Sequence, residues 1–302
     1  MTLKEERELK KAAKLEAEKQ RIEAMREYEE MYDTFSYICG IDEAGRGPLA
    51  GPVVAGAVIL PKGKRILYVN DSKKLSEKKR DELFDVIKEE RELKKAAKLE
   101  AEKQRIEAMR EYEEMYDTFS YICGIDEAGR GPLAGPVVAG AVILPKGKRI
   151  LYVNDSKKLS EKKRDELFDV IKEESLSYGI GIVSPERIDE INILQATYEA
   201  MRDAVSQLSV QPDLLLNDAV TIPGIDIKQI PIIKGDAKSL SIASASILAK
   251  VTRDRLMTEY DSLYPEYGFA KHKGYGTKVH IEAIKEYGPC PIHRRTFIKN
   301  FI

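Results

Sequence analysis

A long stretch of this 302-residue chain occurs twice, and this limits how much distinct fold the chain can contain. Lys4–Glu90 is identical, residue for residue, to Lys88–Glu174, whereas Ser175–Ile302 occurs once. Setting one copy aside leaves about 218 distinct residues, the size of a single ordinary α/β domain. Two perfect copies of so long a unit do not form a solenoid, whose repeats are shorter and more numerous. We interpret the repeat as an in-frame duplication or an assembly artefact, rather than as a design with two active heads.

Charge and cysteine usage narrow the class of protein. The net charge is −1, but residues 250–302 carry ten Lys and Arg against six Asp and Glu, which suits a polyanionic partner. The three cysteines are Cys39, Cys123 and Cys290, and the first two occupy one position of the repeat. This odd number without metal-ligand spacing predicts reduced thiols in a cytoplasmic protein. The charged N-terminus and the lack of a long apolar run argue against a signal peptide or a membrane span.

The repeated block opens with a strongly charged segment that predicts a helix. Lys4–Glu30 is rich in Ala, Glu and Lys and contains neither Gly nor Pro. Its apolar stripe is narrow, which favours a solvated helix over a coiled coil or a nucleic-acid-binding arm. The same residues return at Lys88–Glu114, directly after the helical pattern of Ser76–Glu90, so the two could form one long helix.

Strand-like and helix-like segments alternate along the rest of the chain. Apolar β-branched runs between turn residues predict strands, and longer segments that begin at Ser, Thr or Pro predict helices. The expected strands are Ser120–Ile125, Gly135–Leu144, Ser177–Val183, Leu214–Leu216 and Lys228–Ile233. The expected helices are Lys157–Glu174, Pro185–Leu208, Ser239–Tyr260 and Thr277–Tyr287. This order predicts an α/β fold with a mixed sheet and helices on its faces.

Acidic residues follow three of the expected strands. They are Asp126 with Glu127, Asp218 and Asp236. Each alone would be an ordinary cap or turn residue, but ligands gather at strand carboxyl ends in an α/β sheet. Four converging acids would repel one another unless cations were present, and oxygen ligands select Mg²⁺ or Mn²⁺. The pattern therefore predicts a two-metal site that could hydrolyse a phosphodiester.

Two further segments have the composition of a nucleic-acid contact. Gly129-Arg130-Gly131 matches neither a dinucleotide-binding fingerprint nor a phosphate-binding P-loop. Its bare backbone would let a ligand approach closely, and Arg130 supplies a fork of donors. Tyr275 stands among glycines and basic residues, which suits stacking on a base or sugar, although a tyrosine packed in a turn fits as well. The three histidines, His272, His280 and His293, have no metal-like spacing and are interpreted as surface or packing residues.

Several of these segments together closely resemble bacterial ribonuclease HII. They are GIDEAGRGPLAGPVVAGAVIL, NDSKKLSEKKR, IIKGDAKS with SIASASILAKVTRDR, and HKGYGTKVH with PIHRRTF, in order from about Tyr121 to Phe297. The resemblance implies a ribonuclease H-like fold and a catalytic, metal-binding set of Asp126, Glu127, Asp218 and Asp236. It also implies that Gly129, Arg130, Gly131 and Tyr275 recognise the 2′-hydroxyl at an RNA–DNA junction and that Lys157 contacts a phosphate. Ribonuclease HIII is less similar, since that family lacks the Gly-Arg-Gly segment.

The implied reaction is metal-assisted hydrolysis on the 5′ side of a ribonucleotide, leaving a 3′-hydroxyl and a 5′-phosphate. The implied substrates are RNA·DNA hybrids and duplex DNA that contains single ribonucleotides, and the expected cofactor is Mn²⁺ or Mg²⁺. Two features depart from the family pattern. Asn217 stands where an aliphatic residue is expected before the third acid, and the repeated block has no counterpart.

The expected organisation has three parts. Residues 1–87 form a duplicated, incomplete copy made of the charged helix and part of the catalytic fold. Residues 88–118 form a charged helix or linker, and residues 119–302 form the catalytic domain with its basic C-terminal helical region. A monomer is expected, although the duplicate could drive a domain-swapped oligomer.

Connectivity predicts which copy serves the single-copy acids. The second copy runs directly into Ser175, whereas docking of the first requires a loop of about 85 residues, which costs on the order of 4 kcal/mol. Asp126 and Glu127 are therefore expected to act, and Asp42 and Glu43 to be unused. One alternative is an impaired, hybrid-binding or domain-swapped form, in which the duplicate blocks the cleft. A scaffold built on the two charged helices would leave the other acids without a role.

Overall fold

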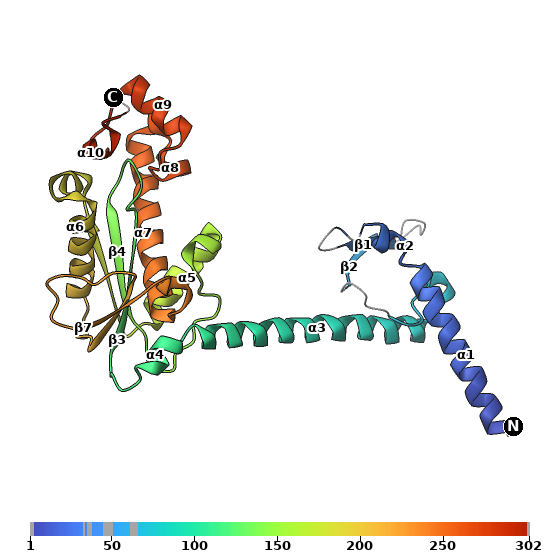
Figure 1. Cartoon of the computed structure of the whole chain (residues 1–302). Coiled ribbons are helices and arrows are strands. Elements are labelled where there is room, and N and C mark those ends of the chain that lie inside the picture. The colour runs from blue at the N-terminus through green and yellow to red at the C-terminus, as the bar shows by residue number, and fades with distance from the viewer. Residues whose placement is uncertain (1–2, 33, 35–37, 45–50, 61–65, 301–302) are drawn as a thin grey trace. The chain divides into compact units, whose positions relative to one another are not determined.

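The computed structural model describes residues 3–32, 34, 38–44, 51–60 and 66–300, which fall into two compact units (Figure 1). The units are Met1–Lys98 and Leu99–Ile302, and each has its own sheet. The boundary between them lies within α3 (Glu77–Ala108), which confirms the prediction of one long helix at this point. Among the residues that the structure describes, no helix is long and apolar enough to cross a membrane.

The second unit is built on a mixed five-stranded sheet, as predicted. Its spatial order is β5-β4-β3-β6-β7, with antiparallel pairing from β5 to β3 and parallel pairing from β3 to β7. The strands are β3 (Ile122–Ala128), β4 (Val137–Ile143), β5 (Ser177–Val183), β6 (Leu214–Asp218) and β7 (Lys228–Ile232). Every residue of β4 is buried, as its unbroken apolar sequence requires for a strand covered on both faces.

Helices cover both faces of this sheet. The long helix α7 (Leu240–Leu263) packs on β3 and β4 and is joined there by α5 (Glu161–Glu174). The helix α6 (Pro185–Ser206) packs on the opposite face, against β4 and β5 (Figure 1). Strand glycines allow this close packing, because a Cβ added at Gly140 would lie 2.4 Å from the carbonyl oxygen of Ala245 in α7. The helices α8 (Phe269–His272), α9 (Lys278–Tyr287) and α10 (Arg295–Ile298) complete the C-terminal region.

The helix starts follow the capping residues, with two differences from the sequence prediction. The helix expected at Lys157 is a short 3₁₀ turn, η2 (Ser156–Lys158), followed by α5, whose first turn is capped by the Ser160 hydroxyl. The helix predicted from Pro185 has a kink at Asn192, where φ is 66°. The Asn192 side chain accepts bonds from the backbone N–H groups of Leu194 and Gln195, so it caps the second half of α6.

The second copy of the charged segment is anchored where it ends. Ile106 is fully buried and Met109 is 4% exposed, so both belong to the core between α5 and α7. Arg105 donates to the carbonyl of Val153 over 2.6 Å, and α4 (Glu111–Met115) follows. The expectation of a solvated helix was therefore wrong for the last turns of this segment, because its apolar side chains Ile106 and Met109 pack into the core formed by α5 and α7.

The first unit contains the same strands without their cover. Its helices are α1 (Leu3–Ala24) and α2 (Glu27–Met31), and β1 (Cys39–Ala44) pairs with β2 (Val54–Ile59) in the register that β3 and β4 use. Every residue of β1 and β2 is exposed, whereas β4, which repeats the sequence of β2, is fully buried. The repeated sequence therefore specifies the strand pairing, but burial of the pair requires α6 and α7, which exist once.

Candidate active site

Asp126 and Glu127 lie at the end of the central strand β3. Ile125 pairs with Asn217 of β6, and Asp126 pairs with Gly140 of β4, so the two acids lie between these strands. Asp126 is 6% exposed, and its side chain accepts a 2.7 Å hydrogen bond from the Glu127 backbone N–H. Burial raises the pKa of Asp126 well above its usual range, and the charges of Glu127 and Asp218 raise it further.

Asp218 and Asp236 approach this pair from β6 and from the 3₁₀ turn η3 (Gly235–Ala237). Asp218 ends β6, and its Oδ1 accepts a 2.7 Å hydrogen bond from the backbone N–H of Gly235. Burial raises the pKa of Asp236, and the charges of Asp155 and Asp218 add to this effect. The lysines Lys157 and Lys158 of η2 act in the opposite direction. The charge of Asp218 thus acts on each of the other three predicted acids, Asp126 and Glu127 at the end of β3 and Asp236 in η3.

The donor chemistry of this neighbourhood fits a hard divalent cation, although the acids do not form a closed ligand cage. Glu127 Oε2 is buried and has no hydrogen-bond partner, and burial raises the pKa of the Glu127 carboxyl. Within the described ranges, no three His, Cys, Asp or Glu side chains come close enough together to hold one metal ion. A cation would satisfy the unpaired oxygen and relieve the mutual repulsion of the carboxylates.

The Gly-Arg-Gly loop and Tyr275 lie next to each other, beside these acids. Arg130 forms a 3.2 Å ion pair with Glu127, which connects the loop to the acidic pair. A Cβ added at Gly131 would lie 3.9 Å from the ring of Tyr275, and this side chain is 47% exposed. The tyrosine is thus not packed away in its turn, and its ring remains accessible to a ligand.

The first copy places its acids in a different environment. Asp42 and Glu43 are exposed, and β1 pairs with β2 alone. A 2.9 Å bond from the Glu43 backbone N–H to Asp42 Oδ1 reproduces the local contact of the second copy. The other acids of the site belong to the second unit, with Asp218 at the end of β6 and Asp236 in η3. Identical local geometry therefore produces two different electrostatic settings.

The comparison with protein families decides the assignment. The family model described as Ribonuclease HII matches residues 39–117 and 123–300. This chain belongs to the ribonuclease HII family. A ribonuclease HII of Lachnoclostridium phytofermentans is 67% identical over 203 residues, which make up 67% of this chain and 80% of that protein. A ribonuclease HII of Clostridioides difficile is 64% identical over 211 residues, or 69% and 83% of the two chains.

Solved structures agree with this assignment. The crystal structure of the ribonuclease H2 from Pyrococcus horikoshii OT3 aligns with a TM-score of 0.50 and 30% identity, over 60% of this chain and 96% of that one. The chain is therefore a ribonuclease H enzyme, a nuclease with a ribonuclease H-like mixed sheet flanked by helices.

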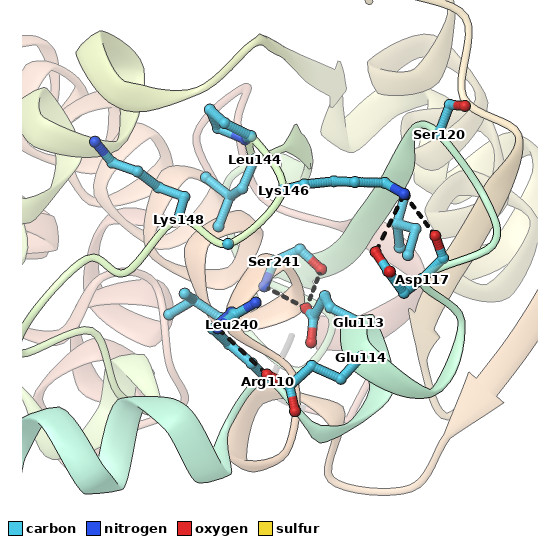
Figure 2. Close-up of a pocket in the computed structure, with 13 residues that line it drawn as sticks. Arg110, Glu113, Glu114, Asp117, Ser120, Leu144, Lys146, Lys148, Leu240 and Ser241 are labelled. Carbon is cyan, nitrogen blue, oxygen red and sulfur yellow. Dashed lines mark hydrogen bonds and ion pairs between the residues drawn. The ribbon is translucent and has the colours of Figure 1, made fainter.

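A well-formed cavity lies elsewhere in this ribonuclease HII (Figure 2). It measures about 360 Å³ and is lined from α4, the β3 and β4 ends and the start of α7, without any of the four acids. Figure 2 shows Glu113 reaching the start of α7, where its Oε1 accepts bonds from the backbone N–H and the hydroxyl of Ser241. Glu113, which belongs to α4, thus caps the start of α7. We interpret the cavity as a gap between packed elements rather than as a ligand site.

Sequence reasoning missed several residues that support the site and gave no role to Asn217, which it did single out. The charge of Asp155 helps to raise the pKa of Asp236, and the Ser246 hydroxyl acts to lower the pKa of Asp126. Asn217, which departs from the expected pattern, is fully buried and donates from its amide to Gln229 over 2.8 Å. Two buried arginines, Arg253 and Arg294, lie beneath the Gly-Arg-Gly loop. The sequence did not mark Arg253 as buried, because Asp254 and Arg255 follow it directly in α7 and give this stretch the look of an exposed charged turn.

Proposed function

We propose that this ribonuclease HII cleaves the phosphodiester on the 5′ side of a ribonucleotide, in RNA·DNA hybrids and at single ribonucleotides in duplex DNA. The proposed products are a 3′-hydroxyl and a 5′-phosphate. The observation that carries the proposal is the shared neighbourhood of Asp126, Glu127, Asp218 and Asp236 beside an accessible Tyr275 and the Gly-Arg-Gly loop. A catalytic group next to a 2′-hydroxyl reader is what ribonucleotide-specific cleavage requires.

In the proposed mechanism, the four carboxylates hold divalent ions, with Mn²⁺ or Mg²⁺ as the candidates. When bound, a pair of such ions would supply an activated water and stabilise the leaving oxygen. The buried setting of Asp126 and Glu127 strengthens their pull on a cation, because it excludes competing water. Asp236 lies within reach of the charges of Lys157 and Lys158, and Lys157 would bind a phosphate of the substrate backbone.

The Gly-Arg-Gly loop and Tyr275 would provide the specificity. The exposed, bare backbone of Gly131 would let the ribose approach closely, with Gly129 shaping the loop beneath it, and the Tyr275 ring, 47% exposed, would stack on the sugar. Arg130 would contribute a charged donor, because its side chain is 46% exposed.

We further propose that the repeat arose by duplication and that the second copy serves the site while Asp42 and Glu43 remain unused. The continuous connection from α5 to β5 supports this choice, as does the pairing of β3 with β6. The chain would then carry one working site and act as a monomer.

A matched pair of substitutions tests both proposals. Asp126→Asn and Asp42→Asn change the same residue of the same local sequence, each in the full chain. With a duplex that carries one ribonucleotide and with Mn²⁺, we expect Asp126→Asn to lose at least 99% of the cleavage rate and Asp42→Asn to keep it. The reverse result would mean that the first copy is docked. No cleavage by the unsubstituted chain, despite tight hybrid binding, would favour the impaired, hybrid-binding form.

A further inference from the structure

Two arginines are buried beside the Gly-Arg-Gly loop and bond to backbone carbonyl groups. Arg253 is 1% exposed and Arg294 is fully buried. Among the described residues, neither guanidinium forms an ion pair, and each donates to three backbone carbonyl groups. Burial of a charge without a counter-charge is costly, and the six hydrogen bonds to backbone carbonyl groups offset that cost. These bonds, rather than packing alone, therefore account for the two arginines.

The Arg294 guanidinium donates hydrogen bonds to backbone carbonyl groups of the Gly-Arg-Gly loop. Its Nη2 donates to Gly129 over 2.5 Å, its Nη1 to Arg130 over 2.9 Å, and its Nε to Gly135 over 3.0 Å. In a planar trans peptide the N–H points away from the carbonyl. The N–H groups of Arg130 and Gly131 are therefore aimed away from Arg294. Within the described ranges, neither of them donates a hydrogen bond to the protein, so both are available to a ligand.

Arg253 connects the same segment to the turn that carries Tyr275. Its Nε and Nη2 donate to Pro136 and Ala134, each over 3.0 Å, and its Nη1 donates to Lys273 over 2.9 Å. Gly129 makes room for this arginine, because its φ is +96° and an added Cβ would lie 2.2 Å from Arg253 Nε. The loop, the arginine and the tyrosine turn thus form one connected unit.

Both guanidinium groups remain charged at neutral pH. Burial lowers the pKa of Arg253 to about 10 and that of Arg294 to about 9. The six hydrogen bonds are therefore charge-assisted, which makes them shorter and stronger than bonds between neutral groups. A lysine at either position could not reproduce them, since one ammonium cannot address three carbonyls in the fork geometry of a guanidinium.

We propose that Arg253 and Arg294 are positioning residues that fix the Gly-Arg-Gly loop against Tyr275 and thereby set the discrimination between ribose and deoxyribose. This inference rests on the proposed function, in which that loop reads the 2′-hydroxyl. Neither arginine touches the substrate. Each acts through the orientation of peptide groups, so its loss should weaken recognition of the ribonucleotide rather than contact with the DNA backbone.

The test compares binding of two duplexes of one sequence, one with a single ribonucleotide and one entirely of DNA. Affinities are measured in EDTA, with the full chain and with Arg253→Lys and Arg294→Lys. We expect both variants to lose at least tenfold of their preference for the ribonucleotide duplex, while their affinity for the DNA duplex changes less than twofold. Arg255→Lys and Arg295→Lys are matched controls, because these neighbours are exposed and bond elsewhere.

The outcomes separate this inference from the function on which it rests. An unsubstituted chain without any preference would overturn the recognition proposal itself. An unchanged preference in both lysine variants, or an equal loss of affinity for both duplexes, would overturn the positioning role alone. Thermal unfolding shows whether each variant is folded. If a lysine variant is unfolded, Arg294→Gln takes its place, because glutamine keeps a hydrogen-bond donor without a buried charge. Its expected loss of preference is the same.

Discussion

At the scale of single residues, Asp126 places activity and stability in opposition. Its carboxylate is buried beside Glu127 and Asp218, and both neighbours oppose its ionisation. We expect Asp126→Asn to lose nearly all cleavage and yet to raise the melting temperature in EDTA, because a neutral amide replaces a carboxyl whose ionisation burial and both neighbours oppose. A gain of about 1 kcal/mol would correspond to roughly 2–4 °C. Asp42→Asn, at an exposed position, should leave the melting temperature unchanged, and a lower value for Asp126→Asn would contradict the argument.

The histidines form an ordered chain of hydrogen bonds instead of a metal site. The Tyr275 carbonyl accepts from His280 Nδ1 over 2.9 Å, so His280 Nε2 must accept from His293 Nε2 over 3.0 Å. His293 Nδ1 then accepts from the backbone N–H and the thiol of Cys290, each over 3.0 Å. Burial raises the pKa of the Cys290 thiol to about 11, which keeps it a donor. The interpretation of these two histidines as packing residues agrees with their burial, but distances along the sequence could not show the chain.

This chain predicts how stability depends on pH. Burial lowers the pKa of His280 and of His293 to about 4, below the value near 6.5 of an unfolded histidine. The unfolded state therefore binds more protons between these values, so the contribution of the histidines is complete above about pH 6.5 and is lost as pH falls towards 4. We expect His280→Gln to show a flatter decline of the urea midpoint over this range than the unsubstituted chain. If the urea midpoints of the two chains declined in parallel with pH, the prediction would be wrong.

At the scale of elements, the repeat offers a controlled test of helix packing on the sheet. Gly140 in β4 and Gly56 in β2 have identical local sequences, but only Gly140 faces α7, whereas a Cβ at Gly56 would meet nothing within 4 Å. We expect Gly140→Ala to destabilise the second unit by about 1–3 kcal/mol, as overpacking does elsewhere. Gly56→Ala should leave that transition unchanged. Calorimetry of the two variants measures this unfolding transition. Equal effects of the two substitutions would mean that the close contact with α7 is not the reason for a glycine at position 140.

The same comparison shows what local sequence can and cannot predict. The strands were predicted to within about three residues, because apolar runs and turn residues act locally. Cys39–Ala44 and Ile122–Ala128 share six residues in one register, yet the first strand is exposed and the second largely buried. That difference depends on α6 and α7, which no pattern inside the repeat contains. The positions of Arg253 and Arg294 escaped for the same reason, since their partners lie more than a hundred residues away for most bonds.

At the scale of the whole molecule, the cost of exchanging the copies should be measurable as residual activity. Docking the first copy requires the second to loop out, at a cost on the order of 4 kcal/mol, or about a thousandfold in population. The Asp126→Asn chain should therefore keep roughly a thousandth of the unsubstituted rate, supplied by Asp42 in the rare exchanged form. Adding Asp42→Asn should remove this remainder.

A shortened chain that begins at Lys88 provides the matching control, because it contains the whole second copy and lacks the acids of the first. It should cleave as fast as the full chain, since the first unit supplies nothing to the docked site. In the shortened chain, Asp126→Asn should leave no residual rate above that of the double variant. A residual rate that persists there would have to come from the remaining acids, and the exchange of copies would then be excluded as its source.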